Sequence, residues 1–328
     1  MKIIIPGGTG QVGTMLARAF HRDGHEVVVF GRGMPKAALW RVKQWSLASP
    51  DGWAEELDGT DVLINLAGRS VNCRYTPKNR REIFDSRVNS VRVLGEGIQG
   101  LNKPPRVWLQ MSTATIYAHT YGASNDEGGP IGGNEPTAPD TWRFSIDVAT
   151  AWEKAFDEVA APATRKVKLR SAVVMSPDRG GIFATLLGLV RFGLGGIAGD
   201  GRQYVSWIHE RDFVRAVYFL IERDDLEGVV NLAAPNPEPN REFMAHLRQA
   251  LGTRIGLPAT KWMLEMGAIF LRTETELILK SRRVIPGRLL RAGFRFAYPE
   301  WEAAAQELCE RWREVSGRPR KEFRHPSN

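Results

Sequence analysis

The chain has 328 residues, of which 43% are hydrophobic, enough to bury a sizeable core in one large domain or two unequal lobes. Its two cysteines, Cys73 and Cys309, cannot form a disulfide framework or a zinc site. This favours a reducing compartment, and we expect the cytoplasm. The formal net charge is +8, but 45 basic residues are spread among 37 acidic ones, so we expect no nucleic-acid partner.

The two ends of the chain carry little structural signal. The amino-terminal sequence MKIIIPGGTG has one basic residue and a short apolar run before its glycines, which fits neither a signal peptide nor a membrane anchor. We therefore expect no membrane partner. Residues 316–328 are basic and contain Pro and Gly, which predicts a solvated tail.

Strands and helices are predicted to alternate through residues 1–175. Short apolar runs predict strands at 2–6, 26–30, 61–66, 106–111 and 166–175. Helical periodicity predicts helices at 11–22, 78–98 and 142–160. Such alternation indicates parallel βαβ units, so the fold class is α/β: a doubly wound parallel sheet, or Rossmann fold.

The alternation loosens in residues 176–315, which predict a smaller, mostly helical substrate lobe. Strands are expected at 204–208 and 228–233, the second returning to the core sheet. Helices are expected at 180–196, 211–222, 241–251, 261–280 and 299–314, and residues 257–315 should form a C-terminal helical extension. Ligands of such sheets bind beyond the carboxyl ends of the strands, so we expect the substrate in a cleft between the lobes.

The segment PGGTGQVG joins the first predicted strand to the first predicted helix. Its glycines have distinct expected roles: Gly7 permits a tight turn, Gly10 lets pyrophosphate approach the backbone, and Gly13 lets the helix pack on the strand. This context predicts a dinucleotide site. The residues expected to contact the dinucleotide here are Gly7, Thr9, Gly10, Gln11, Val12 and Gly13.

The end of the second predicted strand, FGRG, predicts the cofactor type. An NAD enzyme usually presents Asp or Glu there to the ribose 2′-hydroxyl. This chain instead offers Arg32, whose guanidinium suits a 2′-phosphate, with Lys36 and Arg41 as possible helpers. The expected cofactor is therefore NADP(H). The alternative is that Arg32 is an ordinary solvated loop residue.

Several longer blocks resemble the YfcH-like, epimerase-family oxidoreductases, an atypical branch of the extended short-chain dehydrogenase/reductases. The resemblance runs almost end to end. Its blocks are GGTGQVG, INLAG (64–68), DSRVNSVRVL (85–94), SWIHERDFV (206–214), VNLAAPNPEPNREF (230–243) and RRVIPGRLLRAGFRFAYP (282–299).

The resemblance implies site residues beyond the glycine motif. It places Leu66, Ala67 and Gly68 beside the cofactor, with a plain tight turn as the compatible structural interpretation. It makes Arg202 a candidate substrate contact. Asn89 matches a helix asparagine that supports the active site in many relatives, or is a packing residue.

The same resemblance exposes a missing catalytic pair. Ordinary short-chain dehydrogenases use a Ser or Thr that binds the substrate oxygen, and a Tyr that transfers the proton with help from a Lys four residues later. MSTATIY puts Thr113 at the hydroxyl position. Alignment of FSIDVATAWEKAF on Glu153 puts Ser145 and Ala149 where Tyr and Lys belong.

Another proton donor is therefore needed if the protein is an enzyme. Tyr117 is the first candidate and Tyr121 the second, although a packing role for Tyr117 is the alternative. His209 and Asp212 could form an acid/base pair, but a structural role at a helix start is favoured.

These observations lead to three hypotheses about function. The first is an NADP(H)-dependent oxidoreductase of unknown small-molecule substrate, with Thr113 orienting the substrate oxygen. The second is a catalytically silent NADP(H)-binding regulatory or interaction protein, and the third is a nucleotide-sugar epimerase or dehydratase. We expect no metal, and either a monomer or a homodimer.

Overall fold

The computed structural model describes residues 1–33, 38–136, 138–178, 180–259 and 279–316. At its centre is a seven-stranded sheet. Its strands are β1 (Lys2–Pro6), β2 (Glu26–Gly31), β3 (Arg41–Gln44), β4 (Val62–Asn65), β5 (Val107–Thr113), β6 (Arg165–Ser171) and β10 (Gly228–Leu232). They lie in the order β10-β6-β5-β4-β1-β2-β3, and every pair is parallel.

The strand order reverses at β1, which pairs with both β2 and β4. The loops that follow these three strands therefore meet at one edge, which is where open α/β sheets bind ligands. The doubly wound fold predicted from the sequence is confirmed. The strand expected at 228–233 does lie in this sheet, as β10 beside β6.

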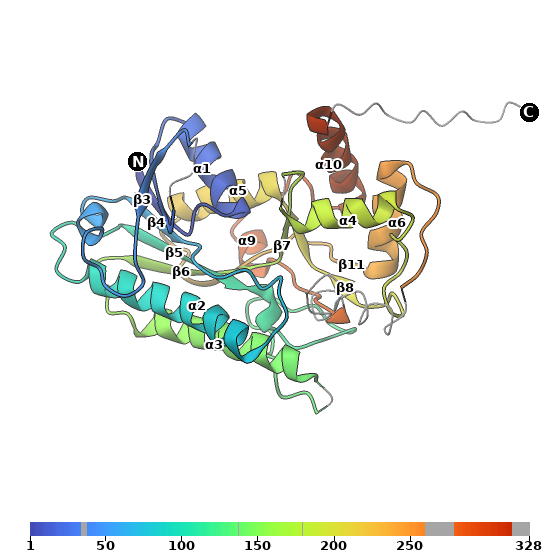
Figure 1. Ribbon diagram of the computed structural model, residues 1–328, viewed down its shortest axis with the longest axis horizontal. Helices are drawn as coiled ribbons and strands as arrows, with labels where there is room; N and C mark the ends of the chain where they lie inside the picture. Colours follow the sequence, from blue (N-terminus) through green and yellow to red (C-terminus); the bar gives the residue numbers. More distant parts are fainter. Residues whose placement is uncertain (34–37, 137, 179, 260–278, 317–328) are drawn as a thin grey trace, which may run out of the picture.

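Two pairs of helices cover the sheet (Figure 1). Helices α1 (Gln11–Arg22) and α5 (Glu210–Glu222) cover one face, and α2 (Pro77–Ile98) and α3 (Asp140–Glu158) cover the other. Alternate residues of each strand point to opposite faces, so Ile3 and Ile5 join the first apolar core while Ile4 joins the second.

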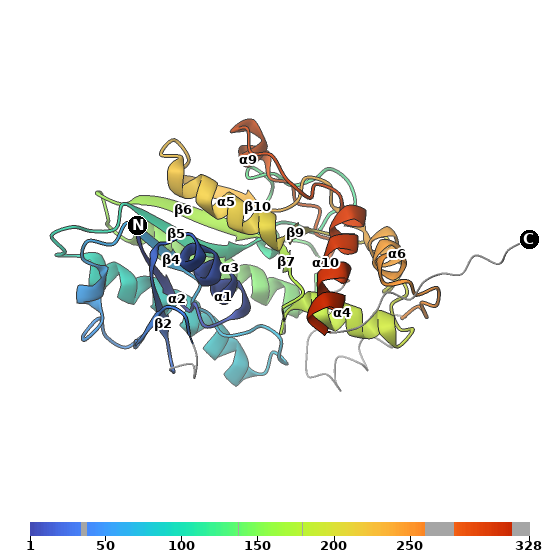
Figure 2. The same cartoon turned by 90° about the horizontal axis from the view of Figure 1, so that it is seen from above.

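A second lobe adjoins the carboxyl end of the sheet and has its own core (Figure 2). Its longer helices are α4 (Ile182–Arg191), α6 (Asn240–Leu251) and α10 (Trp301–Ser316). Trp301 of α10 contacts both other helices, stacking on Phe243 of α6 at a centroid distance of 4.1 Å and packing edge-on to Phe183 of α4. The lobe's short elements are β7 (Val173–Met175), β8 (Tyr204–Val205), β9 (Trp207–His209) and β11 (Glu238–Pro239), whereas the short helix α9 (Gly287–Arg291) packs beside β10 with Leu289 in the core of the sheet.

The predicted strand at 166–175 is wrong in one respect, because the chain changes sheets within it. Ala172 donates its N–H to Leu232 beside the main sheet, and β7 then pairs with β9 in a separate two-stranded sheet. The strand expected at 204–208 is likewise divided, since β8 pairs with β11. Two short 3-10 helices, η1 (Ala54–Leu57) and η2 (Ala114–Ile116), were not predicted.

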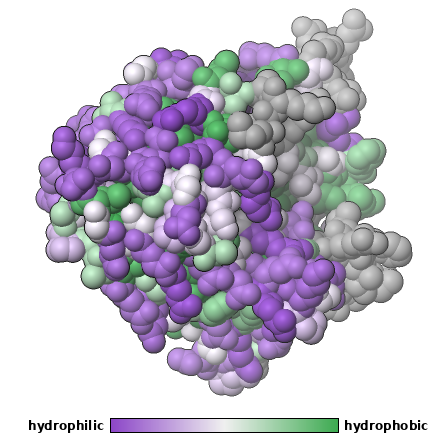
Figure 3. All heavy atoms as spheres, turned by 60° about the vertical axis from the view of Figure 1, so that its left-hand side comes forward, coloured by the Kyte–Doolittle hydropathy of each residue, from purple (hydrophilic) through white to green (hydrophobic). Residues whose placement is uncertain are grey.

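The surface of the molecule is largely polar. The face in Figure 3 is mostly hydrophilic, with apolar side chains in small groups. Among the described residues, no helix is both long and apolar enough to cross a bilayer.

Three sequence predictions fall outside the described residues. They concern most of the helix expected at 261–280, the tail from 317 onward, and Lys36.

Candidate functional site

The turn between β1 and α1 explains why its glycines are needed. Gly7 has a φ of 74°, and a Cβ there would lie 2.6 Å from the Cα of Ala67, so the turn is pressed against the loop after β4. A Cβ on Gly13 would lie 2.3 Å from the Cα of Gly8. Gly13 therefore permits close packing of α1 on the turn, and Gly8 is a partner that sequence reasoning missed.

Gly10 differs from these glycines because the protein itself does not fill the space beside it. A Cβ on Gly10 would meet only the Gly7 carbonyl oxygen, at 3.8 Å. Gly10 is also the N-cap of α1, and no side chain caps the helix. The first N–H groups of α1 are thus free of a side-chain acceptor, as an anion site at a helix N-terminus requires.

A cavity of about 600 Å³, here called the motif cavity, opens at this turn. Residues of four loops line it, and its described lining includes no Asp or Glu. The lining residues include Gly7, Thr9, Gly10, Arg32, Ala67, Gly68 and the segment 44–47, which was not predicted to belong to the site. The exposed Arg32 guanidinium makes no hydrogen bond or ion pair with a described residue and remains available to a ligand.

Arg41 is not a helper of Arg32. Its guanidinium is paired with Glu56 at 2.6 Å and with Glu26 at 3.3 Å, at the outer edge of β3. This part of the sequence-based expectation is wrong, because the two carboxylates flanking β3 hold the side chain there.

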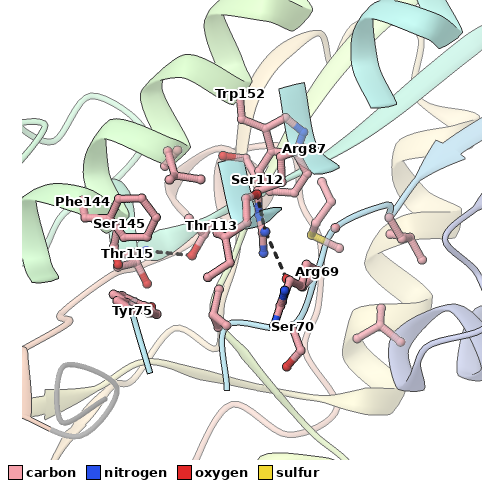
Figure 4. Close-up of a pocket in the computed structure, with 18 of the residues that line it drawn as sticks. Arg69, Ser70, Tyr75, Arg87, Ser112, Thr113, Thr115, Phe144, Ser145 and Trp152 are labelled. Atoms are coloured by element: carbon pink, nitrogen blue, oxygen red, sulfur yellow. Dashed lines mark hydrogen bonds between the residues drawn. The ribbon is translucent and has the colours of Figure 1, made fainter. Parts of the chain in front are cut away.

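A second cavity of about 480 Å³, here called the central cavity and drawn in Figure 4, adjoins the first. The two share Gly68 and Arg69 in their linings. Gln11, Val12 and Leu66 line the central cavity at its junction with the glycine turn. All the residues expected to hold a dinucleotide except Gly13 thus line one or the other of two adjoining cavities at the carboxyl edge of the sheet.

The central cavity also contains the residues expected at the catalytic positions. Thr113 lines it at the end of β5, where its hydroxyl accepts a hydrogen bond from the Thr115 N–H at 3.1 Å. Ser145 and Ala149 line it from α3. Both small residues therefore face the cavity, as the alignment on Glu153 predicts. The cavity is open at the positions where that alignment expects the usual tyrosine and lysine.

Tyr117 is not brought into the cavity, which corrects its candidacy as proton donor. Its side chain is 2% exposed, and its hydroxyl donates to Asn231 Oδ1 at 2.8 Å. Burial raises the pKa of the phenol, although Arg170 over the ring acts in the opposite direction. The alternative, a packing residue with a satisfied hydroxyl, describes what the structure shows.

A buried ion pair supports the cavity wall behind Thr113. Glu153 accepts two hydrogen bonds of 2.8 Å from Arg170, and Ser112 Oγ donates to the same carboxylate at 2.6 Å. The carboxylate raises the pKa of Arg170, outweighing the effect of burial. This arrangement fixes the end of β5 against α3 and so positions Thr113.

The remaining sequence candidates lie elsewhere. Arg202 lines a separate cavity of about 210 Å³ and packs over Tyr121, so the structure does not bring it to the central cavity. Asn89 is not among the residues that line either cavity. In the described part of the chain no group of three or more His, Cys, Asp or Glu side chains is arranged to hold a metal.

His209 and Asp212 have structural positions. His209 is the N-cap of α5: its Nδ1 accepts from the Arg211 N–H, and its Nε2 lies 2.9 Å from a carboxylate oxygen of Glu307. Asp212 accepts the N–H groups of residues 297 and 298. His209 thus joins the start of α5 to α10, and Asp212 joins it to the segment before α10.

Sequence reasoning missed Arg69, Arg87 and Trp152 in the central cavity. Arg87 lies within the block DSRVNSVRVL and four residues after Ile83, so both project from one side of α2. That spacing was the available signal, but helical arginines are commonly solvated, and nothing in the sequence shows which face meets the cavity.

Comparison with known proteins agrees with this architecture. Residues 3–233 match the NAD dependent epimerase/dehydratase family, and residues 259–308 match a domain of unknown function, DUF1731. The human epimerase family protein SDR39U1 is 31% identical over 311 residues, covering 94% of this chain and 99% of its own. The Bacillus subtilis epimerase family protein YfhF is 30% identical over 94% of this chain and 98% of its own.

A solved structure supports the same assignment. The crystal structure of human SDR39U1 (isoform 2) with NADPH superposes with a TM-score of 0.82 and 30% identity, covering 94% of this chain and 99% of that one. The resemblance to an atypical extended short-chain dehydrogenase/reductase is thereby confirmed. The chain belongs to the NAD dependent epimerase/dehydratase family.

Proposed function

We propose that the protein is an NADP(H)-dependent oxidoreductase that acts on a small carbonyl compound or the corresponding alcohol. The observation that carries the proposal is that the two cavities adjoin and share lining residues. The glycine turn and Arg32 border one of them, Thr113 borders the other, and Gly68 and Arg69 belong to both.

The motif cavity suits NADP(H) in three respects. The open space at Gly10 and the uncapped start of α1 suit a pyrophosphate. Arg32, with no carboxylate in the described lining, suits a 2′-phosphate. The solved structure of human SDR39U1, whose chain is similar over almost its whole length, contains NADPH.

The central cavity suits a small substrate beside the nicotinamide, which when bound supplies or accepts a hydride. The Thr113 hydroxyl accepts from a backbone N–H, so its proton remains available to donate to a substrate oxygen. Ser145 lines the same cavity. With Tyr117 buried elsewhere, the proton that completes a carbonyl reduction comes from water through Thr113.

Two other functions compete with this proposal. A silent NADP(H)-binding protein is favoured by the absence of the Tyr and Lys pair, but the space at their positions is an open cavity. A nucleotide-sugar epimerase or dehydratase is least favoured, since such enzymes depend on that pair.

The test is a kinetic screen of the purified protein. NADPH consumption is measured with a panel of aldehydes and ketones, in the parent protein and in Thr113→Val, which keeps the side-chain shape but removes the hydroxyl. Thr113-dependent turnover, even slow, supports the oxidoreductase. Tight NADPH binding with no turnover on any compound favours the silent binder.

A further inference from the structure

Arg87 brings a guanidinium into the central cavity from α2. Its Nη1 donates to two backbone carbonyl oxygens, that of Arg69 at 3.1 Å (Figure 4) and that of Ile83 at 3.0 Å. Both Nη1 protons are thereby used within the protein. Nε and Nη2 have no hydrogen-bond acceptor among the described residues, so three N–H donors remain for a ligand.

The guanidinium is also held in place by packing. It lies 5.2 Å from the ring centroid of Trp152. A Cβ on Gly68 would be 3.2 Å from its Cζ and 3.4 Å from both Nη atoms, so the group lies against the backbone at Gly68. Arg87 is thus a fixed group, and little of its conformational freedom remains to be lost on binding.

Within the part of the chain that the structure describes, no carboxylate balances the charge of Arg87. None in the described residues lies within ion-pair distance of Arg87, and burial lowers its pKa to about 10, which still leaves it protonated at neutral pH. A desolvated charge without a partner is costly in a folded protein. The other arginine of the cavity, Arg69, is by contrast paired with Glu82 and donates to Asn79 at 2.9 Å.

We propose that Arg87 binds a carboxylate group of the substrate, so that the protein acts on a small organic acid bearing a carbonyl or hydroxyl group. This inference rests on the proposed function and specifies its substrate class. One unpaired guanidinium supplies a single positive charge and parallel N–H donors, which match the charge and the two oxygens of a carboxylate. A phosphate dianion would leave a negative charge uncompensated in this cavity.

The rest of the cavity indicates what the acid carries. Phe144, Val148 and Trp152 form an apolar wall along α3, and the small Ala149 leaves room between them. A substrate with an apolar or aromatic body therefore fits, with its carboxylate at Arg87 and its carbonyl oxygen at Thr113.

The test uses matched ligand pairs that differ only in the anion. Phenylpyruvate is compared with phenylacetone, and 4-methyl-2-oxopentanoate with 4-methylpentan-2-one, in each of which a methyl group replaces the carboxylate. Dissociation constants are measured by ligand-detected NMR on the full chain, with and without NADPH, and inorganic phosphate serves as a competitor. The variants are Arg87→Leu, Arg87→Lys and, as control, Arg92→Leu, an exposed arginine on the same helix.

We expect the parent protein and Arg92→Leu to bind at least one acid about 10- to 100-fold more tightly than its neutral partner, the range for a charge-assisted contact. Arg87→Leu should abolish that preference and Arg87→Lys should keep part of it, all with unchanged NADPH affinity. A preference that survives in Arg87→Leu, no preference in the parent, or equal displacement by phosphate overturns the proposal.

Two further outcomes separate this inference from the proposed function. Weaker NADPH binding in Arg87→Leu overturns the inference alone, because the guanidinium would then serve the cofactor. Arg87-dependent acid binding in a protein that binds no NADPH supports the anion site and overturns the proposed function.

Discussion

Ser145 and Ala149 lie one turn apart on α3 and both line the central cavity. The sequence resemblance predicts that they stand at the positions of the proton-transferring tyrosine and its lysine in ordinary short-chain dehydrogenases. At these two positions the central cavity has a small hydroxyl and a methyl group and no phenol or ammonium group.

We predict slow turnover on simple carbonyl compounds and a higher rate when the pair is restored as Ser145→Tyr with Ala149→Lys. General acid/base catalysis typically raises a rate by 10²–10⁴-fold. The rate gain of the double variant should not exceed that range. The measurement is NADPH consumption at saturating carbonyl compound. The control, Ser145→Phe with Ala149→Lys, has the same bulk without a phenol, and an equal gain in both double variants would contradict the proton-transfer explanation.

Gly10 and Gly13 should respond differently to the same substitution. Gly10→Val is expected to abolish dinucleotide binding in a folded protein, because the protein leaves the space at Gly10 open and a pyrophosphate needs it. Gly13→Val should lower the melting temperature instead, since its Cβ would overlap the Gly8 backbone. Thermal denaturation and NADPH titration of both variants check this; retained binding in folded Gly10→Val would mean that the cofactor loop is misplaced.

Tyr117→Phe is predicted to lower the stability of the fold and to leave turnover unchanged. It leaves the buried Asn231 oxygen without its donor, which costs about 1–3 kcal/mol of unfolding free energy. Urea denaturation measures this cost, and Tyr121→Phe, at a side chain that is 44% exposed, is the control. A large loss of turnover in Tyr117→Phe with unchanged stability would restore it as the proton donor.

His209 should make stability depend on pH. Burial lowers its pKa below the ordinary value of 6.5, with Glu307 opposing, so the folded state takes up a proton less readily than the unfolded state. The contribution of neutral His209 to the unfolding free energy is therefore fully present above pH 6.5 and is lost as the pH falls below that value.

The matched variant for this effect is His209→Asn, which keeps a side chain able to cap α5. Urea unfolding is compared at roughly pH 7.5 and 5, on either side of the ordinary histidine pKa. The parent should lose more unfolding free energy than the variant between these values. Identical losses in the two proteins would assign the acid sensitivity to other groups.

The fold could be predicted largely from the sequence, because its first half combines strong periodicity with glycines at the expected turn. The helix at Gln11–Arg22 was predicted with the observed bounds. Short elements were missed where packing decides the structure: β3 reads RVKQ, with one aliphatic residue, and pairs only at the edge of the sheet. The break at Ala172 depends on a partner strand far along the chain.

The candidate site could be predicted in part. The glycine turn, Arg32, Thr113 and the small residues of α3 follow from local motifs, and they border the two cavities. Arg87 could not be assigned, since its lack of a carboxylate partner is a property of the folded cavity. The role of Arg202 as a substrate contact stays a prediction, since this residue lines a different cavity.

The central claim, that the motif cavity holds NADP(H) through Arg32, is tested most directly by titrating NADPH and NADH against the parent protein and Arg32→Ala. The parent should bind NADPH more tightly. The variant should lose about 1.5–3 kcal/mol of NADPH binding free energy, the worth of a charge-assisted hydrogen bond, with NADH almost unchanged. Equal affinities for the two cofactors, or tighter binding of NADH by the parent, would contradict the account.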